Sequence, residues 1–251
     1  MLKQQLFTKF LILAATAILH NSSALSMPGF QTCLLGQQTY IKNCNFVLAS
    51  KSPRRKEIFE LMGISENLQI IPSQFEENLD KNQFKNPGEY ASMTAQSKAA
   101  EVAETQFKLH SASKSVRPMV VIGADTIVEI DGEILEKPED KNHAFEMLSS
   151  LSGKIHLVHT GVAIFTSTHG SQAPASSWYH TTAVEMLNLH ENDLWAYVDS
   201  GEPMDKAGAY GIQGLGGQLV KGISGCYFNV MGFPMSKFSC VLTELIEKEQ
   251  K

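Results

Sequence analysis

A cluster of hydroxyl and cationic side chains occupies residues 50–55, with the sequence SKSPRR, directly after a short apolar stretch. Ser52 is suited to cap a helix and Pro53 to occupy its first position. Arg54 and Arg55 then fall in the first turn, where the helix dipole favours anions. A bound polyphosphate would supply the missing negative charge, since helix N-termini bind anions. The alternative is a solvated basic turn, and we expect first-turn arginines to be exposed and to contribute little to packing.

Acidic residues follow two apolar stretches of the sequence. Asp125 ends the apolar run at residues 120–124 and is either a backbone cap or a site residue. Open α/β sheets bind ligands beyond the carboxyl ends of their strands, which favours a site. Glu76 and Glu77 follow another predicted strand and form either a second part of the site or a solvated acidic turn. Two carboxylates with phosphate oxygens are the usual way to hold Mg²⁺.

Two lysines and two histidines are weaker candidates. Lys98 lies in an alanine-rich segment and Lys137 follows a predicted hairpin, so each alone is typical of a solvated cation. His156 and His159 are three residues apart on a predicted strand, and their side chains therefore point to opposite faces. We predict that these histidines are structural and do not share a metal.

The segment DKAGAYGIQG at residues 205–214 is richer in glycine than an ordinary surface loop. Glycine lets a backbone approach a ligand closely, here at Gly211 among others. The amide of Gln213 can donate and accept hydrogen bonds, which suits the edge of a nucleobase. The segment matches neither the phosphate-loop nor the dinucleotide-binding pattern, because it lacks G-K-[ST] and follows no clear βαβ start.

Alternating strands and helices are expected to position these residues, which makes the fold class α/β. Apolar and alternating stretches predict strands at residues 46–49, 69–72, 119–130, 133–136, 156–165, 178–189 and 218–223. Caps and periodicity predict helices at residues 53–62, 89–107, 141–151, 190–200 and 235–247. The pair Asp131-Gly132 is a hairpin signal, so the sheet is expected to be mixed.

Together these segments resemble the Maf family of nucleotide pyrophosphatases. The matching segments, in order from about residue 45 to about residue 245, are LASKSPRR, EEN, SKA, GADTIV, LEKP, LSG, TGVAIF, SGEPMDKAGAYGIQG and NVMGFP. SPRR, GADT and DKAGAYGIQG are the most specific of them. The last is similar to the branch that acts on dTTP and UTP, not the 7-methyl-GTP branch. Cys226 stands where the family commonly has serine.

The resemblance implies a fold and a reaction. The implied fold is a mixed, strongly twisted sheet flanked by helices, with two lobes and a central cleft. The implied reaction is hydrolysis of dTTP or UTP to the monophosphate and pyrophosphate, with a divalent cation, Mg²⁺ or Mn²⁺, as cofactor.

The resemblance also implies residue roles. Asp125 activates water and, with Glu77, holds the metal. The residues implied to surround the triphosphate are Ser50, Arg54, Arg55, Lys98 and Lys137, of which the two lysines count as catalytic. The positions linked to substrate choice are Arg54, Thr126 and Gln213.

Charge and cysteine content bear on partners and compartment. A formal net charge of −5 over 251 residues argues against a broad basic face for nucleic acid but permits a local cationic cluster. Four cysteines without a C-x-x-C pair are typical of a reducing compartment. We expect a cytoplasmic enzyme whose partner is its nucleotide substrate, with no nucleic acid, no stable membrane span, and a homodimer as the assembly to consider.

Residues 1–44 are predicted to be an N-terminal extension, and residues 45–247 the catalytic domain. The apolar run at residues 10–19 follows two lysines and precedes a polar stretch, a pattern similar to a secretory or organellar targeting signal. That run is short for a membrane span. The alternative is an unstructured extension, or a gene-start artefact, ahead of a cytosolic domain.

Two other functions compete with dTTP and UTP hydrolysis. One is a purine or 7-methyl-GTP specificity within the same family, against which the context of Gln213 argues. The other is a non-enzymatic nucleotide-binding regulator of cell division, which would not need a water-activating base such as Asp125. A small panel of nucleotides separates the three.

Overall fold

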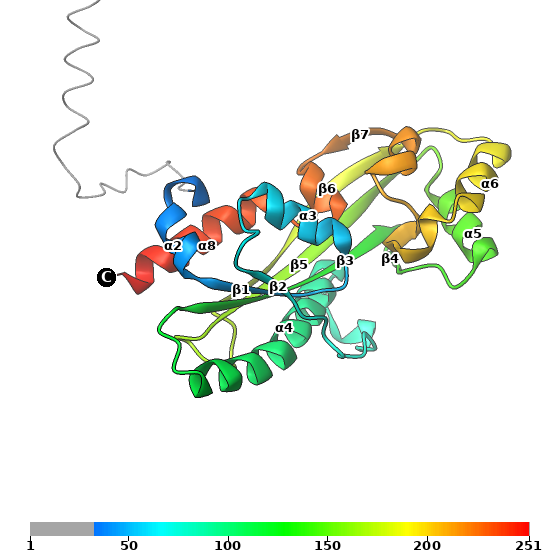
Figure 1. Cartoon of the computed structure of the whole chain (residues 1–251). Coiled ribbons are helices and arrows are strands. Elements are labelled where there is room, and N and C mark those ends of the chain that lie inside the picture. The colour runs from blue at the N-terminus through cyan, green and yellow to red at the C-terminus, as the bar shows by residue number, and fades with distance from the viewer. Residues whose placement is uncertain (1–32, 251) are drawn as a thin grey trace, which may run out of the picture. The chain divides into compact units, whose positions relative to one another are not determined.

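A mixed sheet of seven strands forms the centre of residues 33–250, the part of the chain that the computed structural model describes (Figure 1). The strand order is β2-β1-β3-β5-β6-β7, and β4 pairs with a further part of β3. The strands are β1 (Asn45–Ala49), β2 (Leu68–Ile70), β3 (Met119–Ile130), β4 (Glu133–Leu135), β5 (Ile155–Thr166), β6 (Ser176–Met186) and β7 (Val220–Ser224).

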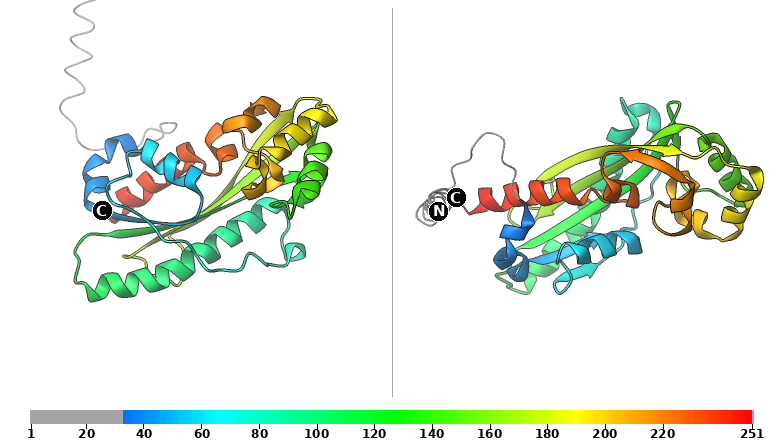
Figure 2. Two further views of the ribbon diagram at one scale, coloured as in Figure 1. Left: turned by 45° about the vertical axis from the view of Figure 1, so that its right-hand side comes forward. Right: turned by 90° about the horizontal axis from the view of Figure 1, so that it is seen from above.

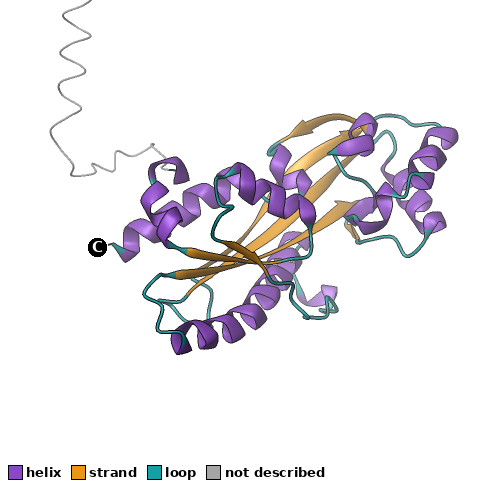
Figure 3. Ribbon diagram, viewed as in Figure 1, coloured by secondary structure: helices purple, strands orange, loops and turns teal. Residues whose placement is uncertain are grey.

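Helices alternate with the strands along the chain (Figure 3). The α-helices are α2 (Gln38–Asn43), α3 (Pro53–Leu61), α4 (Pro87–Ala112), α5 (Lys141–Leu151), α6 (Glu191–Asp199), α7 (Tyr227–Met231) and α8 (Met235–Glu249). Short 3₁₀ helices are η1 (Leu34–Gly36), η2 (Lys81–Gln83), η3 (Glu202–Asp205), η4 (Ala207–Ala209) and η5 (Gly214–Leu219). Among the described residues, no helix is long and apolar enough to span a bilayer.

The pairing directions confirm a mixed sheet. β1 runs parallel to β2 and β3, whereas β3 to β7 pair with their neighbours in antiparallel fashion. β3 and β4 are joined through Asp131 and Gly132, whose φ angles are 54° and 86°. Positive φ at both central residues is the requirement of the hairpin turn that the Asp-Gly pair predicted.

α4 lies very close to one face of the sheet, while α3 and α8 cover the other face (Figure 2). A Cβ atom on Gly123 in β3 would lie 2.2 Å from the carbonyl oxygen of Ala95, and one on Gly161 in β5 would lie 2.2 Å from that of Ala91. Only glycine permits this approach. The alanine-rich sequence of α4 and these two glycines therefore set how α4, and with it Lys98, sits against β3.

The described residues contain four hydrophobic clusters, of which two are the largest. The first joins β1, α3 and α8, and its phenylalanines Phe59, Phe233 and Phe238 pack with ring centroids 4.9–5.4 Å apart. The second joins α5, α6 and the glycine-rich segment through Leu148 and Tyr210, among others. Burial of this apolar surface is the main stabilising contribution to the fold.

Part of the predicted N-terminal extension packs into the first cluster. Leu34, Ile41 and Cys44 are buried there, and the backbone N–H of Leu34 donates to Ser239 Oγ at 2.9 Å. The packed part of the chain thus starts ahead of the boundary drawn at Asn45. The apolar run at residues 10–19 lies outside the described residues.

Candidate functional site

A cavity of about 790 Å³ lies where one edge of β3 is uncovered. β1 pairs with this edge up to Gly123 and β4 pairs from Val128 onward, so residues 124–127 have no strand partner on that side within residues 33–250. The cavity lining contains every residue that the sequence singled out for the site: Ser50, Arg54, Arg55, Glu77, Lys98, Asp125, Thr126, Lys137 and Gln213. These residues come from six separate segments of the chain.

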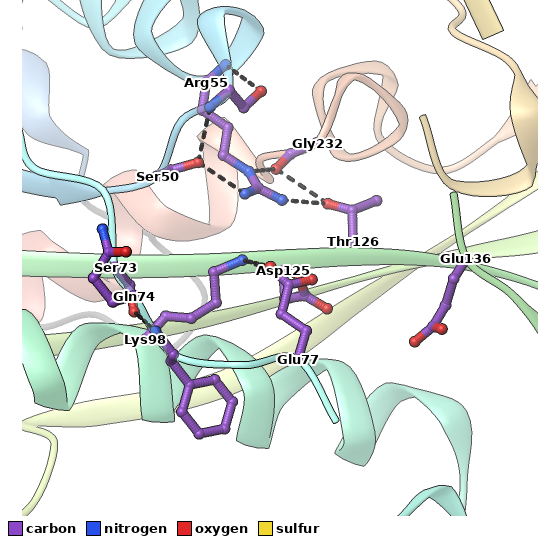
Figure 4. Close-up of polar contacts among 12 residues, drawn as sticks. Ser50, Arg55, Ser73, Gln74, Glu77, Lys98, Asp125, Thr126, Glu136 and Gly232 are labelled. Atoms are coloured by element: carbon purple, nitrogen blue, oxygen red, sulfur yellow. Dashed lines mark hydrogen bonds and ion pairs between the residues drawn. The ribbon is translucent and has the colours of Figure 1, made fainter. Parts of the chain in front are cut away.

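Asp125 lies on the α4 side of β3 with Lys98 and Glu77 (Figure 4). The ammonium of Lys98 is 3.3 Å from Asp125 Oδ1 and 2.9 Å from Glu77 Oε1. Burial raises the pKa of the Asp125 carboxyl above its usual range, and Lys98 opposes that effect. Burial also acts to raise the pKa of Glu77, but Lys98 outweighs it and the pKa is lowered. A buried carboxylate of raised basicity next to a fixed cation suits proton acceptance.

Thr126 is the next residue in β3 and therefore points to the opposite face, toward Arg55 (Figure 4). The guanidinium of Arg55 donates to Gly232 O at 2.9 Å, to Ser50 Oγ at 3.0 Å and to Thr126 Oγ1 at 3.0 Å. Only 8% of Arg55 is exposed. The expectation of an exposed arginine with little role in packing is wrong, because the first turn of α3 lies between the end of β1 and the loop after α7.

Arg54 points instead toward the glycine-rich segment. Its guanidinium forms an ion pair with Asp205 at 3.1 Å, and 22% of its side chain is exposed. Ser52 caps α3 as predicted, since its hydroxyl accepts from the backbone N–H of Arg55. The two arginines therefore differ in environment: one is fixed in the interior and one lies at the edge of the cavity.

Two lysines of the cavity lining, Lys51 and Lys137, are exposed and have no hydrogen-bond or ion-pair partner among the described residues. Lys206 also lines the cavity but is buried, and it donates to Glu202 O at 2.5 Å and to Asp205 Oδ1 at 2.6 Å. No individual role was predicted for Lys51 or Lys206, although both lie within segments that were singled out in the sequence. The positive charge left unneutralised in the lining can bind an anion.

Glu101 fixes the loop that carries Glu77. Its carboxylate accepts the backbone N–H groups of Gln74 at 3.0 Å and Phe75 at 2.9 Å, and also the hydroxyl of Ser73. Glu101 lies about one turn after Lys98 on α4. α4 thus positions both the ammonium of Lys98 and the loop that carries Glu77, whose carboxylate pairs with that ammonium. This residue was missed, because two of its partners are backbone groups, which leave no mark in the sequence.

The glycine-rich segment is held by another acid, the partly buried Glu202. The Glu202 carboxylate accepts the backbone N–H groups of Leu215 and Gly216, each at 3.0 Å, and the hydroxyl of Tyr197, also at 3.0 Å. At Gly211 a Cβ atom would lie 2.7 Å from Cε of Lys206. Gly211 lines the cavity, and any side chain at this position would meet Lys206.

Gln213 lies in the cavity lining, and its amide nitrogen is 2.9 and 3.0 Å from the two carboxylate oxygens of Glu57 on α3. The two histidines lie apart, as the strand spacing predicted. His156 contacts the Tyr210 hydroxyl at 2.7 Å, whereas His159 contacts Glu129 at 2.9 Å.

Comparison with known proteins matches residues 45–245 to the family described as Maf-like protein. A human protein, described as a probable bifunctional dTTP/UTP pyrophosphatase/methyltransferase protein, is 50% identical over 203 residues. The match covers 79% of this chain and 32% of the human protein, so this chain spans about a third of that relative. The dTTP/UTP pyrophosphatase of Clostridium tetani is 42% identical over 202 residues, covering 80% of this chain and 97% of its own length. A solved structure of a HAM1 protein from Coxiella burnetii is 17% identical in sequence, with a TM-score of 0.40. The match covers 80% of this chain and 99% of the HAM1 chain.

Proposed function

The chain belongs to the Maf-like protein family, and we propose that it hydrolyses dTTP and UTP to the nucleoside monophosphate and pyrophosphate. One observation carries the proposal: the buried carboxylate of Asp125 lies in a cavity whose lining also holds the exposed cations Lys51 and Lys137, which have no ion-pair partner among the described residues. Attack of water on a phosphate needs a base for the water and positive charge for the phosphoryl oxygens. Relatives that are 42–50% identical carry dTTP/UTP pyrophosphatase in their names.

The triphosphate is proposed to lie between the first turn of α3 and Lys137. Arg55 is held by three hydrogen bonds, so its charge is fixed before the substrate arrives. Fixed charges stabilise a developing negative charge without reorganisation during the reaction. Ser50 and Arg54 flank it at the cavity wall and give further donors to phosphate oxygens.

Asp125 is proposed to accept the proton of the attacking water. The water oxygen then forms a bond to the α-phosphorus, the bond from that phosphorus to the bridging oxygen breaks, and pyrophosphate leaves with the electron pair. Lys98 holds the Asp125 carboxylate in place through its 3.3 Å ion pair. Lys137 is a donor for the negative charge that develops on the phosphate oxygens.

A divalent cation, Mg²⁺ or Mn²⁺, fits the acidic part of this site. Asp125 and Glu77 already share one cation, the ammonium of Lys98, at 3.3 and 2.9 Å. No cluster of three His, Cys, Asp or Glu side chains suited to a metal occurs in the described part of the chain, so phosphate oxygens would complete the ligand set. When bound, the ion would supply positive charge to the phosphate oxygens.

Substrate choice is proposed to depend on Gln213, Thr126 and Arg54. The Gln213 amide carries a donor and an acceptor side by side, which can pair with the N3–H and a carbonyl of uracil or thymine. A site that hydrogen-bonds such groups rejects analogues that leave its own polar atoms unpaired.

The test is a panel of dTTP, UTP, CTP, GTP and ATP with Mg²⁺, in which monophosphate and pyrophosphate are both measured. We expect equal amounts of the two products, with dTTP and UTP as the best substrates. Release of inorganic phosphate together with the nucleoside diphosphate would show cleavage of the anhydride between the β- and γ-phosphates instead. Equal rates for GTP and UTP would establish the purine alternative, and binding without hydrolysis would establish a non-enzymatic binder.

A further inference from the structure

Within residues 33–250, the side chain of Gln213 forms hydrogen bonds to Glu57 alone. Its two carboxylate oxygens lie 2.9 and 3.0 Å from Gln213 Nε2. Gln213 is part of the cavity lining, whereas Glu57 is not. Glu57 can therefore act on a ligand in the cavity only through Gln213, which lies 156 residues away in the sequence.

The chemistry of the pair sets the direction of the Gln213 amide. A carboxylate can only accept hydrogen bonds, so the amide nitrogen must face Glu57 and Oε1 must point away. The two oxygens of one carboxylate subtend a narrow angle at Nε2, which lets a single N–H serve both. The second N–H and Oε1 are then left as a neighbouring donor and acceptor for a ligand.

With the base held in one position, uracil and thymine match this arrangement in one orientation of the Gln213 amide only. Their N3–H donates to Oε1, and the adjacent carbonyl accepts from the free N–H. Cytosine has an acceptor at N3 and an amino donor beside it, so a cytosine held in the same position pairs only if the amide flips. In the flipped state Oε1 would face the Glu57 carboxylate, where two acceptors repel one another.

We propose that Glu57 is a positioning residue for base selection: it fixes the Gln213 amide in the orientation that accepts uracil and thymine and disfavours cytosine. The proposal rests on the proposed function of the same cavity. It adds a residue on α3, outside the cavity lining, to the determinants of specificity.

A merely structural role for Glu57 predicts something different. α3 is also joined to the glycine-rich segment by the ion pair of Arg54 and Asp205, at 3.1 Å. Loss of the Glu57 contact should therefore leave the segment attached and the protein folded. Glu57 is exposed, and water competes for its hydrogen bonds, so we expect a moderate effect on selectivity.

The experiment compares kcat/KM for UTP and CTP in the wild type, in Glu57→Gln and in Glu60→Gln. The amide introduced by Glu57→Gln can pair with either orientation of the Gln213 amide. The ratio of kcat/KM for UTP to that for CTP should therefore fall about tenfold, mainly because kcat/KM for CTP rises. Glu60 lies on the same helix and pairs with Lys56, and its replacement should leave the ratio unchanged.

A second arm places Glu57→Gln in a Gln213→Ala background. Since Glu57 acts through Gln213, the second substitution should not alter the ratio further there. An unchanged ratio in the single Glu57→Gln variant, or an equal loss for both nucleotides, overturns the proposal. The wild type is judged first: absence of hydrolysis, or no preference for UTP over CTP, overturns the proposed function itself and the role of Glu57 with it.

Discussion

The ammonium of Lys98 lies 3.3 Å from the carboxylate of Asp125, and the two side chains are only 11% and 9% exposed. Removal of Lys98 leaves the Asp125 charge buried without its ion-pair partner. We expect Lys98→Met to lower the free energy of unfolding by about 3 kcal/mol. Urea denaturation measures this value, and the double variant Lys98→Met/Asp125→Asn should recover a large part of the loss.

Lys108 provides the matched control for that variant. It lies on the same helix and pairs with Glu104, but both side chains are well exposed, so Lys108→Met should leave the denaturation midpoint unchanged. If Lys98→Met and Lys108→Met unfold at the same urea concentration as the wild type, the buried pair makes no contribution to stability.

Arg55 is expected to matter for both stability and activity. Arg55→Ala removes donors from Gly232 O, Ser50 and Thr126, which should lower the free energy of unfolding by about 3 kcal/mol. It should also reduce kcat/KM for UTP. Arg54→Ala removes a partly exposed ion pair, so it should reduce kcat/KM with little change in stability. Equal stability of the two variants would contradict the difference in their environments.

Glu101 should affect turnover through the position of the Glu77 loop. Glu101→Gln keeps the size of the side chain but weakens its bonds to the backbone N–H groups of residues 74 and 75. We expect kcat for UTP to fall about tenfold while the circular dichroism spectrum is unchanged. Glu104→Gln, one turn along α4, is the control and should keep wild-type turnover. A normal kcat in Glu101→Gln would show that the loop is held by other contacts.

We expect the buried His156 side chain to make the folded protein less stable at acidic pH. Burial lowers its pKa from 6.5 to about 4, so below pH 6.5 the unfolded chain binds a proton that the folded chain does not. Above pH 6.5 the His156 imidazole is neutral in both states and does not reduce the free energy of unfolding. As the pH falls from 6.5 toward about 4, the free energy of unfolding decreases by an amount on the order of 3 kcal/mol.

The measurement for His156 is the free energy of unfolding as a function of pH. His156→Gln should lack this part of the pH dependence, whereas His169→Gln, at an exposed position, should keep it. Parallel pH curves for the wild type and His156→Gln would show that the pKa of the His156 imidazole is the same in the folded and the unfolded chain.

Local signals in the sequence predicted most of the fold. Ser52 caps α3 as predicted, because an N-cap acts on backbone groups within three residues, and Asp140 caps α5 in the same way. The strand at residues 119–130 was predicted with its observed bounds, since its apolar run is long and ends at an Asp-Gly turn. The helix predicted to end at Phe107 extends to Ala112, because neither glycine nor proline interrupts residues 108–112.

Features that depend on distant contacts were not predicted. α7 has five residues, too few for a helical pattern to be visible in sequence. The burial of Arg55 results from a bond to Gly232, 177 residues away, and no local pattern distinguishes it from its neighbour Arg54. The contact of Gln213 with Glu57 is of the same kind. The sequence named residues that gather in one cavity, while their individual environments required the structure.

Asp125→Asn tests the central claim most directly, because it keeps the shape of the side chain and removes its ability to accept a proton. The measurement pairs the kcat for UTP with the equilibrium dissociation constant of UTP for the same protein. We predict a fall in kcat of at least about 100-fold, the scale of general-base loss, with nucleotide binding retained. A variant that hydrolyses UTP at close to the wild-type rate would contradict the assignment of Asp125 as the base.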